Sequence, residues 1–172
     1  MQTSKTNILI VAPYTKRLGI AVFSNADLIH FAVKTLRSPR TIESVNTEIS
    51  IQLKHLSRKF APRLVIIKAL SKRQRSSEKQ QHMARAIRQF AAAKGIESKD
   101  VAFDRVKQKL SVEGRPTMAT TFTTVRRAFP ELARFDHFQN PSQRIYYTSL
   151  LSAVAIGFAH YRNNPQDHEI SP

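Results

Sequence analysis

Alternating or continuous apolar positions predict five β-strands. Residues 7–13 are mostly β-branched or apolar and end at Pro13, which is typical of a buried strand. The segment LVII at residues 64–67 has no polar interruption, which predicts a strand covered on both faces. Short polar turns separate the first three predicted strands, which favours an antiparallel meander. The five strands are predicted at residues 7–13, 18–23, 28–36, 63–70 and 101–110.

Apolar residues three or four positions apart predict four helices. Ser38 and Pro39 are the expected N-cap and first residue of the first helix, and Gly95 is the expected end of the second. The four apolar stripes are Ile42, Val45, Ile49, Leu53, Leu56 and Phe60; Met83, Ile87, Phe90 and Ala91; Met118, Phe122, Val125 and Phe129; and Leu151, Val154, Ala155 and Phe158. The order βββ-α-β-α-β-α-α predicts an α/β fold with a mixed sheet flanked by helices. We expect one domain over residues 1–162 and a flexible C-terminal tail at 163–172.

Composition narrows the class of protein. The 172 residues are 41% hydrophobic and include no cysteine, which indicates a globular chain without disulfide bonds or thiolate metal sites. The apolar run at residues 8–12 is too short for a membrane span, so we expect a cytoplasmic protein. Four glycines are too few for a phosphate-binding P-loop or a dinucleotide fingerprint.

The charge balance predicts a polyanionic partner. The chain has 28 Lys and Arg against 12 Asp and Glu, which gives a net charge of +16. A field of this sign attracts polyanions, and nucleic acid is the commonest of them. An acidic membrane surface or an acidic protein would satisfy the same charge.

Three segments resemble the RuvC-type Holliday-junction resolvases. Residues 8–22, ILIVAPYTKRLGIAV, resemble the family pattern ILGIDPGSxxxGxxV, and residues 16–22 are equally similar to the YqgF group. The segment VKQKL at 106–110, with Gly114 after it, is similar to the family's VKQx(V/L)xGxG, and SAVAIGFAH at 152–160 is similar to DALAIAxxH. The resemblance implies a ribonuclease-H-like mixed five-stranded sheet, a homodimer and DNA as the favoured partner.

The carboxylates of that family are missing. The family cuts DNA with Asp and Glu side chains that hold divalent metal ions, because hard cations prefer oxygen ligands. The resemblance places these carboxylates at Ala12, at Ile67 or Lys68, and at Ser149 and Ser152. No Asp or Glu lies before Asp27, between residues 48 and 78, or between 136 and 167, so a small shift in alignment does not restore them. Tyr14 also replaces the family's glycine after the first acid.

Basic residues are the candidate phosphate contacts. They are Lys16, Arg17, Lys68, Lys72, Arg73, Arg75, Lys79, Lys107, Lys109 and Arg115. A solvated basic face is the alternative reading of the run between 68 and 88. Lys107 is retained from the family pattern, whereas Met118 stands where the family often has a second basic residue. Tyr14 is a candidate for stacking on bases, whereas Tyr146 and Tyr147 are expected to pack within the fold.

The sequence therefore predicts a non-catalytic protein that binds DNA, branched or duplex, or structured RNA through phosphate contacts, with no membrane and no cofactor. A divergent nuclease is one alternative. It would need Mg²⁺ and a new site built around Asp104, the one acid within a predicted strand. A basic module that binds an acidic protein is the other. The six histidines show no zinc-protease motif, so we expect no resident metal.

Overall fold

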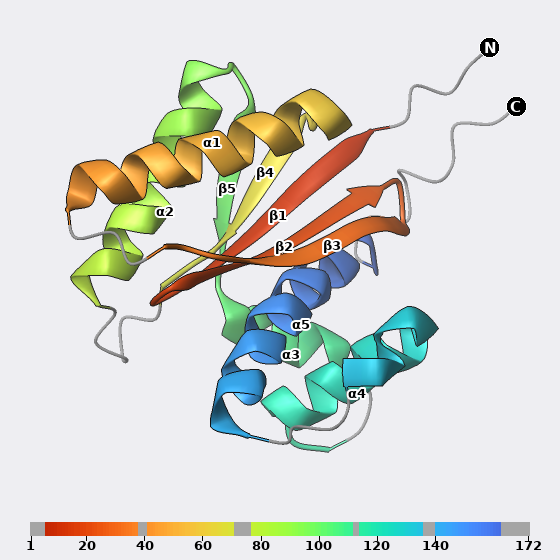
Figure 1. Cartoon of the computed structure of the whole chain (residues 1–172). Coiled ribbons are helices and arrows are strands. Elements are labelled where there is room, and N and C mark those ends of the chain that lie inside the picture. The colour runs from red at the N-terminus through yellow and green to blue at the C-terminus, as the bar shows by residue number, and fades with distance from the viewer. Residues whose placement is uncertain (1–5, 38–40, 71–76, 112–113, 136–139, 163–172) are drawn as a thin grey trace, which may run out of the picture.

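Five strands form one mixed sheet in the computed structural model, which describes residues 6–37, 41–70, 77–111, 114–135 and 140–162. The strands are β1 (Asn7–Tyr14), β2 (Arg17–Ser24), β3 (Asp27–Thr35), β4 (Leu64–Lys68) and β5 (Glu97–Val101). Their order across the sheet is β3-β2-β1-β4-β5 (Figure 1). The first three pair antiparallel, and β4 runs parallel to both β1 and β5. The predicted fold class is confirmed.

Helices cover both faces of the sheet (Figure 1). One face carries α1 (Ile42–Phe60) and α2 (Glu78–Ala93). The other carries α3 (Phe103–Leu110), α4 (Met118–Ala128), the short 3₁₀ helix η1 (Pro130–Phe135) and α5 (Pro141–Arg162). No helix in the described ranges is long and apolar enough to cross a membrane.

Strand alternation divides the core into two layers. Leu9, Val11 and Ile67 are buried beneath α1 and α2, whereas Ile10, Ala12 and Ile66 are buried beneath α5. Except for Ile42, which is 50% exposed at the start of α1, the predicted helical stripes supply the helical side of both layers, and Phe122 is buried with 6% exposure. α5 is apolar over most of its circumference because it lies between the sheet and the helices α3 and α4.

The predicted strand at residues 101–110 is wrong. The strand ends at Val101, and Phe103–Leu110 form α3. Val106 and Leu110 are buried while Gln108, which a strand would place on the same face, is exposed, so the burial follows the period of a helix and not that of a strand. The true strand, ESKDV, has few apolar residues because β5 is the edge of the sheet. Asp104 therefore belongs to the first turn of α3.

The first helix also begins later than predicted. Its N-cap is Thr41, whose side chain accepts a hydrogen bond from the Ser44 amide, while the Ser44 hydroxyl oxygen accepts one from the Thr41 amide. This reciprocal capping box satisfies two amides that the helix leaves unpaired. Ser38 and Pro39 lie outside the described residues, as does the predicted tail at 163–172.

Candidate nucleic-acid interface

The candidate site lies where β1 and β4 end beside α5. Parallel strands bring their carboxyl ends to the same edge of a sheet, and here those ends are Tyr14 and Lys68. The Lys68 ammonium donates a hydrogen bond of 2.7 Å to the Tyr14 hydroxyl. That hydroxyl lies 2.9 Å from the hydroxyl of Ser152 on α5. Three residues that are far apart in the sequence thus form one polar chain.

The register decides which residue of β4 faces α5. Ile67 pairs with Val11, and both side chains lie in the core beneath α1 and α2. Lys68, the next residue, therefore projects to the opposite face, on which Ala12 is buried. Of the two positions considered for the fourth-strand carboxylate, it is Lys68 that lies with Ala12 and Ser152, and its side chain has the charge opposite to that of a carboxylate.

Helix α5 packs unusually close to the sheet at this point. Gly19 of β2 pairs with Ala12, and a Cβ added to Gly19 would lie 1.9 Å from the carbonyl oxygen of Ser149. Ser149 and Ser152 are both fully buried, and the Ser149 hydroxyl donates to the Tyr146 carbonyl at 2.7 Å. Small residues at these positions let the backbone of α5 lie directly on the sheet.

Two aromatic rings lie beside the Lys68 ammonium. Its Nζ lies 4.2 Å from the centre of the Tyr14 ring and 5.2 Å from that of Phe103, the first residue of α3. Such cation–π contacts orient an ammonium while leaving its charge in place. An ammonium has three N–H donors, and the hydrogen bond to Tyr14 uses one. The site therefore presents a fixed positive charge that is suited to a phosphate oxygen.

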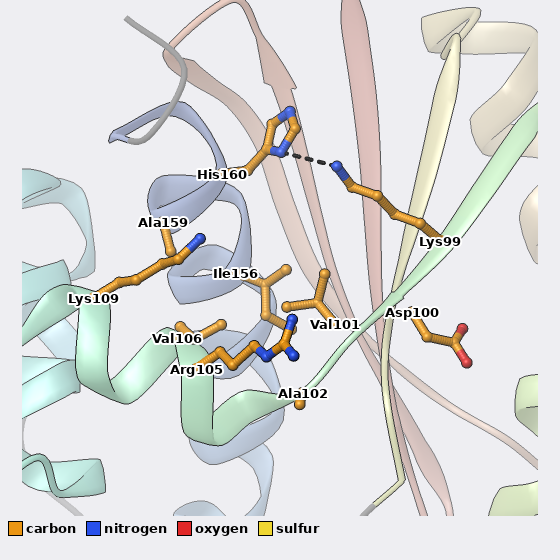
Figure 2. Close-up of a pocket in the computed structure, with 10 residues that line it drawn as sticks. All are labelled: Lys99, Asp100, Val101, Ala102, Arg105, Val106, Lys109, Ile156, Ala159 and His160. Carbon is orange, nitrogen blue, oxygen red and sulfur yellow. Dashed lines mark hydrogen bonds between the residues drawn. The ribbon is translucent and has the colours of Figure 1, made fainter.

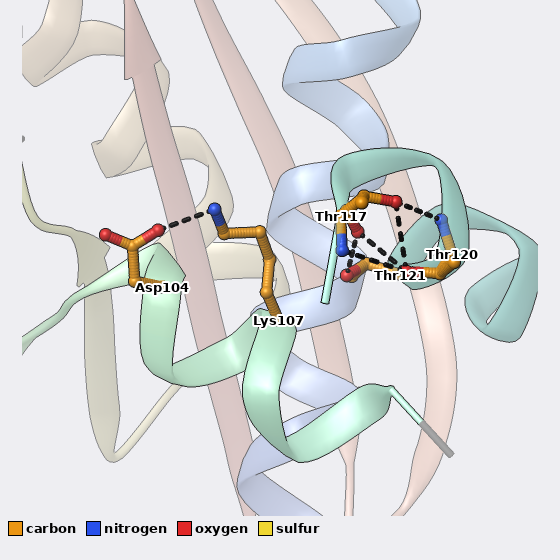
Figure 3. Close-up of polar contacts among 5 residues, drawn as sticks. All are labelled: Asp104, Lys107, Thr117, Thr120 and Thr121. Atoms are coloured by element: carbon orange, nitrogen blue, oxygen red, sulfur yellow. Dashed lines mark hydrogen bonds and ion pairs between the residues drawn. The ribbon is translucent and has the colours of Figure 1, made fainter. Parts of the chain in front are cut away.

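Helix α3, whose first residue Phe103 contacts Lys68, has a second ammonium one turn further on, at Lys107. Lys107 forms an ion pair with Asp104, one turn earlier, at 2.6 Å (Figure 3). Asp104 is 79% exposed while Lys107 is only 25% exposed, so the carboxylate lies toward solvent. On the neighbouring helix, Thr117 and Thr120 form the capping box that begins α4 (Figure 3). Arg115, an exposed residue, lies two positions before that cap.

The other basic residues that were predicted to contact phosphate lie on several different elements. Lys16 lies in the turn after β1, and the Arg17 guanidinium is held 5.6 Å from the Tyr146 ring and donates to the Ser142 carbonyl at 3.1 Å. Lys79 lies in the first turn of α2. Lys109 lies on α3 about 200° around the helix from Lys107, so the two do not share a face. Lys72, Arg73 and Arg75 lie outside the described residues.

The tyrosines have different positions. Tyr14 is the last residue of β1, and its hydroxyl belongs to the polar chain with Lys68 and Ser152. The sequence, which suggested a polar turn at this position, did not reveal these hydrogen bonds. Tyr146 and Tyr147 are half-buried; they contact each other, and Tyr147 also packs against Phe135. Phe103, which contacts Lys68, was missed because its segment was predicted as a strand.

The described residues include no group of three His, Asp or Glu side chains able to hold a metal ion. At the positions that the resemblance assigns to carboxylates, the structure has a methyl group, an ammonium and two hydroxyls. An ammonium repels a divalent cation and attracts a phosphate, so this donor set does not fit Mg²⁺.

Comparison with known proteins rests on structure alone, because the sequence matches no protein-family model and no curated protein. The chain is similar to T. thermophilus RuvC in complex with a Holliday junction substrate, with a TM-score of 0.68 and 19% identity over 94% of this chain and 96% of that one. It is also similar to the yeast mitochondrial Holliday junction resolvase Ydc2, with a TM-score of 0.53 and 12% identity over 96% and 87%. The fowlpox virus resolvase in complex with Holliday junction DNA gives a TM-score of 0.51 and 12% identity over 96% and 100%. The chain thus has the fold of the RuvC-type Holliday-junction resolvases.

Proposed function

We propose that this protein binds DNA on a RuvC-like scaffold without cleaving it, and that it favours branched DNA. The observation that carries the proposal is the Lys68 ammonium, which is fixed against Tyr14 at the ends of β1 and β4. The positions that the resemblance assigns to metal ligands hold Ala12, Lys68, Ser149 and Ser152. The net charge of +16 supplies the long-range attraction.

Two of the similar structures support DNA as the ligand, because both hold Holliday junction DNA. In the proposed complex a backbone phosphate contacts Lys68, and Lys16, Lys107 and Arg115 contact neighbouring phosphates. Such contacts fix the position of the DNA without reading its sequence. We therefore expect recognition of DNA shape rather than of base order, with structured RNA as a weaker ligand and a homodimer as the binding unit.

The substitution Lys68→Met tests the proposal. Methionine keeps an unbranched apolar side chain, one atom shorter than lysine, but removes the charge and the N–H donors. Losing one charge-assisted hydrogen bond costs about 1.5–3 kcal/mol, so the affinity for a four-way junction should fall about 10- to 100-fold. The slope of log K against log salt should become shallower by about 0.9, since one phosphate contact is lost. Fluorescence anisotropy with a labelled junction and a linear duplex, over a salt series with Mg²⁺ present, measures both quantities.

Lys54→Met is the matched control. Lys54 is an exposed residue of α1, on the opposite face of the sheet, and its replacement removes the same charge. We expect its affinity to stay within about threefold of the wild type. Equal losses in the two variants would mean that net charge alone drives binding, and would contradict the assigned site.

The same assay addresses the two alternatives. Cleavage of the junction in Mg²⁺ or Mn²⁺ that disappears in Asp104→Asn would establish the nuclease. The ion pair of Asp104 with Lys107 gives that reading no support, since it offers a single exposed carboxylate. A protein with no salt-sensitive affinity for any nucleic acid would instead be a module that binds an acidic protein.

A further inference from the structure

A small cavity lies along the outer edge of the sheet, between β5, α3 and the C-terminal half of α5 (Figure 2). Its volume is about 150 Å³. Its polar lining residues are Lys99, Asp100, Arg105, Lys109 and His160. The cavity holds roughly five waters at about 30 Å³ each, so it admits a phosphate group but not a nucleoside.

Three cationic side chains and a histidine, from three elements, line this cavity. Lys99 comes from β5, His160 comes from α5, and Arg105 and Lys109 lie one turn apart on α3. The Lys99 ammonium and the His160 Nδ1 are 3.3 Å apart, which holds both side chains at the wall of the cavity (Figure 2). Arg105 and Lys109 are exposed residues, so their charged ends reach the mouth of the cavity.

The one carboxylate in the lining is already neutralised. Successive residues of a strand point to opposite faces, so Asp100 points away from Lys99 and Val101 (Figure 2). Its carboxylate accepts two hydrogen bonds from Arg88 of α2, of which the contact to Nε is 3.2 Å long. The cavity is therefore positive, and no described acid other than Asp100 lines it.

Apolar side chains form the inner wall. Val106 and Ile156 are each 1% exposed and Ala159 is 3% exposed. An apolar wall excludes water from one side of a bound anion, which strengthens its attraction to the cations on the other side. The pocket thus has an apolar inner wall and positively charged side chains at its opening.

This cavity shares no lining residue with the site at Tyr14 and Lys68, although its Val101 pairs with Lys68 in the sheet. A helix turns about 100° per residue, so Arg105 and Lys109 lie about 160–200° around α3 from Lys107. Val106 and Leu110, which are buried, occupy the face between them. One helix thus presents cations to two different surfaces.

We propose that this cavity is a phosphate-binding site, with Arg105, Lys109 and Lys99 as its cations and the His160 ring as a further polar contact. The guanidinium of Arg105 suits two oxygens of one phosphate, because its N–H groups form a planar fork. The phosphate belongs either to a small phosphorylated compound or to a nucleic-acid backbone that passes the β5 edge.

Titration with inorganic phosphate at constant ionic strength tests the site, followed by two-dimensional ¹H–¹⁵N NMR. We expect saturable shifts of the amides of β5 and α3 and of the His160 ring, with chloride as the reference anion. Arg105→Gln and Lys109→Gln should each weaken phosphate binding at least fivefold. Lys107→Gln, on the far side of the same helix, should change it less than twofold. The substituted residues are exposed or part-exposed, and thermal unfolding confirms that each variant folds.

A second arm distinguishes the two sources of phosphate. If a short duplex shifts the same resonances and competes with phosphate, the ligand is the DNA backbone. If phosphate binds and the duplex does not disturb these resonances, the ligand is a small phosphorylated compound. Shifts that do not saturate, or that persist unchanged in Arg105→Gln, would overturn the site. The outcome is independent of the proposed function, because Lys68→Met should leave phosphate binding unchanged while it weakens junction binding.

Discussion

Gly19→Ala tests how α5 is positioned over the candidate site. The added methyl group would lie 1.9 Å from the carbonyl oxygen of Ser149, 2.4 Å from its carbonyl carbon and 3.1 Å from the amide nitrogen of Leu150. All three are backbone atoms, so a change of rotamer does not relieve the clash. The helix must move away by about 1 Å, since non-bonded atoms do not approach within about 3 Å.

That movement carries a large cost in stability. Overpacking in a core typically costs 1–3 kcal/mol, and here we expect about 3 kcal/mol or more because a 22-residue helix has to shift. For a chain of this length, 1 kcal/mol corresponds to about 2–4 °C, so Tm should fall by at least about 6 °C. The shift also separates Ser152 from Tyr14, whose hydroxyl groups are 2.9 Å apart.

Urea and thermal unfolding, followed by circular dichroism at 222 nm, measure this loss. Gly95→Ala is the control, because Gly95 has a φ of +66° but nothing within 4 Å of an added Cβ. Its cost comes only from the left-handed backbone, about 1–2 kcal/mol. A Gly19→Ala variant that loses no more stability than Gly95→Ala would refute the close approach of α5 to β2.

Three further predictions concern single side chains. Tyr14→Phe should lower the free energy of unfolding by about 1–2 kcal/mol, because the buried Ser152 hydroxyl loses a hydrogen-bond partner. Adding Ser152→Ala to that variant should then lower stability little further. If urea unfolding shows the effects of the two substitutions to be fully additive, the contact is contradicted. Asp104→Asn should increase DNA affinity, because it removes the carboxylate that pairs with the Lys107 ammonium. The free energy of unfolding should change by less than about 1 kcal/mol. Unchanged anisotropy curves would place Lys107 outside the interface. Burial, with the positive charges of Lys59 and Lys34 and the nearby His55, lowers the pKa of His30 below its usual 6.5. The unfolded state therefore takes up this proton first, and stability should fall as the pH drops below about 6.5; His30→Gln should show a smaller fall, and an equal one would refute the assignment.

The sequence alone predicts those features of the candidate site that depend only on which residue types are present. The absence of acids from β1, β4 and α5 is visible in the printed chain, and so is the excess of positive charge. The hydrogen bonds of Tyr14 with Lys68 and with Ser152 join residues 54 and 138 positions apart, which no local pattern encodes. The choice between Ile67 and Lys68 required the strand register, since a shift of one residue exchanges the two faces of a sheet.

The error at residues 101–110 had a consequence for the site. A strand would have placed Lys107 and Lys109 on one face, because they are two positions apart. In α3 they point to nearly opposite sides, and Lys109 joins Arg105 at the cavity beside β5. The error arose because β5 is short and polar and is followed at once by a helix of eight residues. Neither element is long enough to show a clear strand or helix periodicity in the sequence.

The sequence by itself determined the α/β class, the central strands, the basic character of the protein and the absence of acids from β1, β4 and α5, because these depend on local periodicity and on residue type. The tertiary structure decided which cations share a surface and which residue of β4 faces α5. It also showed why Gly19 has no side chain, since the backbone of Ser149, 130 positions later in the chain, occupies that space. Local patterns record which face of an element is buried, but only the packed fold determines what lies against it.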